Sequence, residues 1–162
     1  MTVVFFLFLT HLGLGLLATL PLVPDRAGTS YFKFCSAAAA LAMTAAVALL
    51  VRRFGLVGGA AWPEATYRPL LVASTASLIF AVLYNRAHHF SWRRLSPVLL
   101  GGSLAAGAAG VALSAPPADR ILVGLTDLTS ILLLGAATSA MVLGHWYLVV
   151  LDLPIKIGRA HV

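Results

Sequence analysis

Long apolar runs separated by short polar segments dominate the chain. Five runs are close to spanning length, at residues 3–22, 33–51, 69–86, 97–115 and 121–151. A helix of about 20 mostly apolar residues crosses the hydrocarbon core of a bilayer and satisfies its own backbone hydrogen bonds there. Prolines fall near the ends of these runs, where they do not interrupt a helical ladder. The pattern predicts an all-α protein, a polytopic transmembrane helix bundle with about five spans, forming a single domain over residues 1–155.

Small residues recur every four positions in the fourth run, at Gly102, Ala106, Gly110 and Ser114. Membrane helices associate through such faces, because small side chains let two backbones approach closely. We therefore expect the helix at 97–115 to lie at the centre of the bundle and to pack tightly against its neighbours.

The composition agrees with a membrane protein. Hydrophobic residues make up 60% of the chain and charged residues 10%, against about 25% charged residues in soluble domains. The formal net charge is +6, but the basic residues stand in short clusters beside the apolar runs, which is typical of topology determinants and headgroup contacts. We expect the lipid bilayer and other membrane subunits as partners, not nucleic acid, and a bacterial inner (cytoplasmic) membrane as the location.

The first run is interpreted as a retained span. No lysine or arginine precedes it, and it is longer than the apolar core of a signal peptide. Basic residues are densest at 86–94, and the positive-inside rule then favours the cytoplasm for that loop and the outside for the N-terminus. Cys35 is the only cysteine, which excludes an internal disulfide.

The last residues need a separate interpretation. Ile157 to Val162, IGRAHV, match the translation of ATC GGA AGA GCA CAC GTC, a widely used short-read sequencing adapter, and Lys156 fits the same frame as AAG. We interpret residues 156–162 as a translated adapter and not as native sequence. The natural chain is therefore expected to continue beyond Ile155.

The fifth run carries polar side chains that hydrocarbon penalises. At helical spacing they fall on one stripe, which consists of Asp127, Ser130, Leu134, Thr138, Met141, His145 and Asp152. Polar groups within a span turn towards protein or a wet cavity and away from lipid. We therefore predict that three side chains face the interior of the bundle, namely Thr138, Met141 and His145. The same stripe predicts that three other side chains point away from the interior, namely Leu132, Val142 and Trp146.

Two histidines lie inside predicted spans, His11 in the first and His145 in the fifth. With five spans these two helices run in the same direction, so that tilt could bring the histidines level. Paired imidazoles from two helices are a usual ligation of haem b in membranes. His11 and His145 are therefore candidate haem ligands. The alternative is that each histidine hydrogen-bonds to a hydroxyl or a carbonyl group of a neighbouring helix.

A proton or ion path is a second candidate site on the fifth run. Asp127 would stand at one end of the path and His145 at the other, with Thr138 between them. The alternative for Asp127 is solvation in the headgroup layer. This alternative stays open because the fifth run is longer than the bilayer core, so that its start is free to lie outside the hydrocarbon.

These features favour a non-catalytic subunit or assembly factor of a membrane complex, with a redox or haem complex suggested by the histidines. The alternative is a fragment of a proton-coupled transporter or permease. The chain has no Gly-rich phosphate loop, no zinc motif and no serine or cysteine nucleophile arrangement, which argues against an enzyme. A subunit predicts a closely packed interior or a cofactor slot. A transporter predicts a polar cavity open to one side.

Overall fold

The computed structural model describes residues 2–54, 67–89, 96–114 and 117–149. These residues form five α-helices, which are α1 (Thr2–Thr19), α2 (Thr29–Phe54), α3 (Tyr67–His89), α4 (Ser96–Ser114) and α5 (Arg120–Val149). The predicted all-α fold with five helices is confirmed for this part of the chain. Residues 55–66 and 150–162, which include Asp152 and the adapter-like end, lie outside the described residues.

Three of the helical segments are long and apolar enough to cross a membrane. They are Val4–Leu22, Thr29–Arg53 and Arg120–Leu148. The other two helices have shorter apolar stretches, Leu71–Ala87 in α3 and Pro97–Gly107 in α4, within the residues that the structure describes. Length and composition therefore indicate an integral membrane protein with three candidate spans.

A tight turn joins α1 to α2. Two short 3-10 segments, Leu20–Leu22 and Asp25–Ala27, lead to Gly28, whose φ of 81° lies in the left-handed region that glycine adopts without strain. The helix then begins at Thr29, and the Tyr31 amide donates to the Gly28 carbonyl oxygen over 3.1 Å. The sequence pattern placed this start at residue 33, because the polar residues after Gly28 carry no hydrophobic signal.

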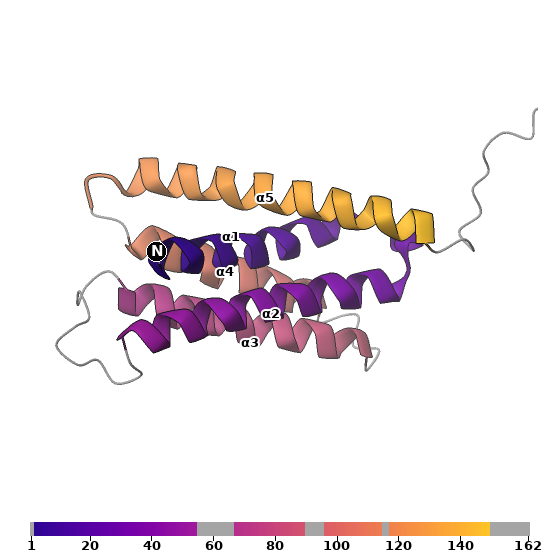
Figure 1. Ribbon diagram of the computed structural model, residues 1–162, viewed down its shortest axis with the longest axis horizontal. Helices are drawn as coiled ribbons and strands as arrows, with labels where there is room; N and C mark the ends of the chain where they lie inside the picture. The colour runs from indigo at the N-terminus through magenta and orange to yellow at the C-terminus, as the bar shows by residue number, and fades with distance from the viewer. Residues whose placement is uncertain (1, 55–66, 90–95, 115–116, 150–162) are drawn as a thin grey trace, which may run out of the picture.

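Consecutive helices run antiparallel, so that α1, α3 and α5 share one direction (Figure 1). The central helix is α1, which contacts each of the other four. Its side chains are buried on several faces, as at Leu14 and Leu17, whereas α4 leaves Val98 and Leu113 exposed. The expectation that the helix at 97–115 would be central is therefore wrong. The expectation that this helix packs tightly is confirmed, because a Cβ at Gly102 would meet the Phe80 ring of α3 and one at Gly107 would collide with Leu14 of α1.

Hydroxyl and amide groups join the helices where they pack. The Ser77 hydroxyl donates to the Ser103 carbonyl oxygen and the Ser103 hydroxyl donates to that of Ser77, both over 2.9 Å, which links α3 to α4. The Asn85 amide of α3 donates to the Lys33 carbonyl oxygen of α2 over 3.0 Å. These three side chains thus satisfy their polar groups between helices, as an apolar surrounding favours.

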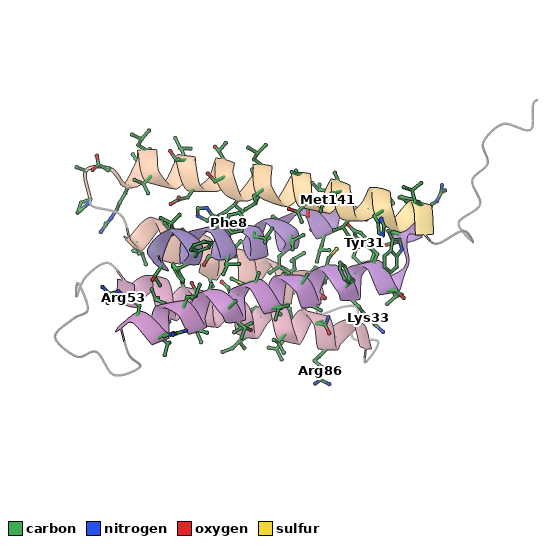
Figure 2. The ribbon with its side chains drawn as sticks, viewed as in Figure 1. Phe8, Tyr31, Lys33, Arg53, Arg86 and Met141 are labelled. Atoms are coloured by element: carbon green, nitrogen blue, oxygen red, sulfur yellow. The ribbon has the colours of Figure 1, made fainter. Side chains whose placement is uncertain are left out.

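The first turn of α2 also contacts the C-terminal half of α5. Tyr31 is wholly buried, and its hydroxyl lies 2.9 Å from the Ser139 hydroxyl (Figure 2 labels Tyr31). The Tyr31 ring meets the Trp146 ring edge to face, with centroids 6.1 Å apart. Aromatic pairs in this geometry contribute beyond their buried area. α2 and α5 are therefore in contact although α1 lies beside both.

The face that α5 packs inwards differs from the predicted polar stripe. Its inward face runs through Ile131, Gly135, Ser139, Val142 and Trp146. Met141 is 70% exposed and His145 is also exposed, so both predictions for these residues are wrong. The predictions for Val142 and Trp146 are wrong as well, since both pack against the core. Thr138 is half-buried, and Leu132 is exposed as predicted.

Candidate functional site

An ionisable pair joins α1 to α5. The Nε2 atom of His11 lies 3.5 Å from the Oδ1 atom of Asp127, and the two side chains are 11% and 19% exposed. Counted along α1 at about 1.5 Å per residue, His11 stands about 10 Å from Val4 and about 16 Å from Leu22, the ends of that candidate span. The imidazole and the carboxyl group therefore lie at the depth of hydrocarbon if the helix crosses a bilayer.

Two glycines hold the pair together. Gly15 lies one turn after His11, and a Cβ there would collide with the Ile131 carbonyl oxygen. A Cβ on Gly135 would collide with the backbone of Gly15. The two backbones thus touch at this crossing, because neither residue has a side chain to separate them. The helices α1 and α5 run in the same direction. One turn before the crossing, His11 of α1 therefore lies beside Asp127 of α5.

The pair can hold one proton in two ways. The proton resides on the carboxyl group beside a neutral imidazole, or on the imidazole beside a carboxylate. Either arrangement has no net charge, which a low-dielectric surrounding favours over an isolated ion. Loss or gain of a further proton leaves a net charge at this place. The chemistry available is therefore binding and release of a proton within the bundle.

Two further buried hydroxyl groups lie at about the level of the pair along the bundle. Thr10 and Ser74 are both 1% exposed, and among the described residues neither their hydroxyl oxygens nor the His11 Nε2 atom has a hydrogen-bond partner, so the 3.5 Å approach of His11 to Asp127 is an ion-pair distance and not a hydrogen bond. Leu71 packs against the cluster of Phe6, and Leu78 packs against the cluster of Leu14. Since α1 and α3 run in the same direction, Thr10 and Ser74 fall between these two contacts. Buried hydroxyls of this kind are the groups that an internal water or ion binds.

The hydroxyls beside Asp127 on α5 serve their own helix. Thr126, Thr129 and Ser130 each donate to the carbonyl oxygen four residues earlier, over 2.9, 2.7 and 2.8 Å. These three side chains are therefore satisfied locally and do not extend the pair towards α1. The buried hydroxyls without a partner, Thr10 and Ser74, belong to α1 and α3, which the polar stripe of the fifth run does not include.

The two candidate haem ligands are not brought together. His11 meets Asp127, whereas His145 is exposed and lies about 27 Å further along α5 at about 1.5 Å per residue. The arrangement of the side chains gives no support to a haem b held by His11 and His145. The path from Asp127 through Thr138 to His145 likewise ends at an exposed residue. In the described ranges, no three His, Cys, Asp or Glu side chains are grouped so as to hold a metal ion.

Comparison with protein-family models found no match, and comparisons with curated proteins and with solved structures found none either.

Proposed function

We propose that this chain is a five-span integral membrane protein whose His11–Asp127 pair binds and releases protons, in a proton-coupled transporter of the bacterial inner membrane. The observation that carries the proposal is the 3.5 Å approach of an imidazole and a carboxyl group at mid-span depth. Ionisable residues inside spans are rare, and they commonly mark proton relays and ion pathways.

The five-span part of the proposal rests on the lengths and surfaces of α3 and α4. These helices have 23 and 19 residues, which correspond to about 34 and 28 Å, close to a hydrocarbon core of about 30 Å, although their described apolar stretches, Leu71–Ala87 and Pro97–Gly107, are shorter. The large hydrophobic side chains that α3 exposes include Val72, Ile79, Val82 and Leu83. An exposed surface of this kind suits lipid. The orientation, with the N-terminus outside, stays a prediction.

Infrared difference spectroscopy tests the proton site. The protein is placed in lipid bilayers, and spectra are recorded while the pH of the bulk water is changed. We expect a carboxylic-acid C=O band that changes with pH in the wild type and is absent from Asp127→Asn. Asp119→Asn is the matched control, because Asp119 lies in an exposed turn and should leave this band intact. A band unchanged in Asp127→Asn would overturn the proposal.

A non-catalytic subunit of a membrane complex is the second candidate, and the surface of α5 favours it. Ala136, Ala140 and Gly144 are exposed and lie four residues apart, which is a face that membrane helices use to associate. The infrared experiment also separates the two functions. A proton-coupled transporter requires the Asp127 proton to exchange with bulk water, whereas a subunit that uses the pair only for packing does not.

A further inference from the structure

The face of α1 that meets α5 changes from exposed to buried along the helix. Val4, Phe8, His11 and Gly15 follow one another at intervals of three or four residues, so they share that face. Val4 is 65% exposed, and Phe8, which is labelled in Figure 2, is 48% exposed. His11 is 8% exposed and Gly15 is buried. Exposure therefore falls steeply from the start of α1 to the level of His11.

The facing side of α5 changes in the same way. Gly124, Ile131 and Gly135 lie seven and four residues apart and share one face. Asp127 stands between the first two. A Cβ on Gly124 would meet nothing within 4 Å. Ile131 is only 6% exposed, and a Cβ on Gly135 would collide with the backbone of Gly15. The two helices therefore touch at the crossing and lie apart near their starts (Figure 1).

The open space between these two rows is called the wedge below. It is bordered by Val4, Phe8 and Gly124 and ends at the ionisable pair. Both candidate spans begin at its wide end, α5 with the charged residue Arg120. The carboxyl group of the pair is seven residues from Arg120, or about 10 Å, which agrees with the depth of the imidazole along α1. The wedge thus leads from the membrane surface to the pair.

The other side of the pair is closed. Beyond the crossing, α1 continues through Leu16, Leu17 and Leu20, which are at most 4% exposed. About 16 Å separate the imidazole from the end of the span at Leu22. Within a bilayer, an ionisable group draws water from the surface through local defects in the lipid. The shorter and more open way for that water is the wedge.

We propose that the wedge is the route by which the His11–Asp127 pair exchanges protons with water, on the side of the membrane at which α1 and α5 begin. A hydronium ion in the wedge passes its proton to the pair, and the reverse step returns the proton to water. The contact of Gly15 with Gly135 closes the pair to the opposite side. The inference rests on the proposed function, because it requires that the pair binds and releases protons.

Hydrogen–deuterium exchange of the Asp127 carboxyl group tests the route. The whole protein in lipid bilayers is transferred to deuterated buffer, and the shift of the carboxylic-acid C=O band is followed in time by infrared spectroscopy. Gly124→Leu places a side chain in the open space. We expect it to slow the exchange about tenfold, the effect of about 1.4 kcal/mol added to the barrier. Gly144→Leu is the matched control, because a Cβ there also meets nothing within 4 Å, and it should leave the rate unchanged.

Phe8→Ala changes the wedge in the opposite sense. It removes a half-exposed ring from the α1 side and should accelerate the exchange, whereas Phe34→Ala, at a phenylalanine of α2 that is 52% exposed, should not. An unchanged rate in Gly124→Leu, or equal slowing by Gly144→Leu, would overturn the inference alone, since the band itself would still be present. Absence of the band from the wild type would overturn the proposed function and the inference with it.

Vesicles of known orientation test the side. A pH step is applied to the outer medium only, and an added N-terminal tag identifies the vesicles that expose the start of α1. We expect the Asp127 band to respond at once in those vesicles, and in inverted ones only after the internal pH has followed. An immediate response in the inverted vesicles would contradict the inference, because the pair would then be open to the opposite side.

Discussion

Gly135→Ala is expected to destabilise the bundle by about 1–3 kcal/mol, the usual cost of forcing an extra group into a well-packed core. A Cβ on Gly135 would collide with the backbone of Gly15. A backbone cannot move aside as the end of a flexible side chain can. The helices α1 and α5 must then separate. The contacts between them before and after the crossing must lengthen, including the one between His11 and Asp127.

The matched control lies on the same helix. A Cβ on Gly144 would meet nothing within 4 Å, so Gly144→Ala should be neutral or slightly stabilising, because alanine is the better helix former. Unfolding in mixed detergent micelles, followed by circular dichroism, measures both variants. Equal destabilisation by the two substitutions would show that helix propensity, and not the crossing of α1 and α5, sets the cost.

His11→Leu is expected to destabilise the protein by about 1–3 kcal/mol, the cost of leaving a largely buried polar group without its partner. Asp127 keeps its position beside α1 in this variant, but the imidazole 3.5 Å away is gone. Replacing both partners removes the unsatisfied group, and an apolar pair of suitable size is often no less stable than a buried ion pair. His11→Leu/Asp127→Leu should therefore recover most of the lost stability.

His145→Leu is the control for this cycle. His145 is exposed on α5, and its substitution should change the unfolding free energy by less than about 0.5 kcal/mol, as is usual for surface positions. The same unfolding measurement serves all variants. A cost at residue 145 as large as at residue 11, or no recovery in the double variant, would contradict the pairing.

The helices themselves were predictable from the sequence. Each depends on a local run of apolar residues ended by prolines, glycines or charges, and these signals require no knowledge of neighbours. The start of α2 was missed because Gly28 permits a sharp reversal, and the helix then begins on Thr29 and Ser30, which are polar. A glycine followed by two hydroxyl residues was the available signal.

The rotation of α5 was not predictable from its polar stripe. The stripe and the inward face share Asp127, but the inward face continues through Ile131 and Gly135 and leaves Met141 outside. The reason is that the backbones of α1 and α5 touch at Gly15 and Gly135, and this contact sets the rotation of α5. The place of the contact depends on the sequences of both helices together. Small residues alone do not identify this face, because Ala136, Ala140 and Gly144 form a second small face of α5 that is exposed.

The pairing of His11 was missed for the same reason. Histidines inside two spans indicate haem ligation, and the polar stripe groups Asp127 only with side chains of its own helix. Gly15 stands four residues after His11, and Gly135 stands eight after Asp127. These two glycines, in helices that run in the same direction, were the sequence signal for the contact between His11 and Asp127. The signal becomes specific only once α1 and α5 are known to cross at the glycines.

The most direct test of the account is whether lipid covers the exposed apolar surfaces of α3 and α5. In a Cys35→Ala background, single cysteines are introduced as Ile79→Cys in α3, Leu133→Cys in α5 and Arg26→Cys in the first turn. Ile79 and Leu133 are 55% and 71% exposed in the fold, so a bundle in water would leave both open to reagent. We predict that intact membranes protect residues 79 and 133 from an aqueous maleimide while residue 26 is labelled, and that denaturing detergent exposes all three. Labelling of residue 79 as fast as residue 26 in intact membranes would contradict a five-span protein.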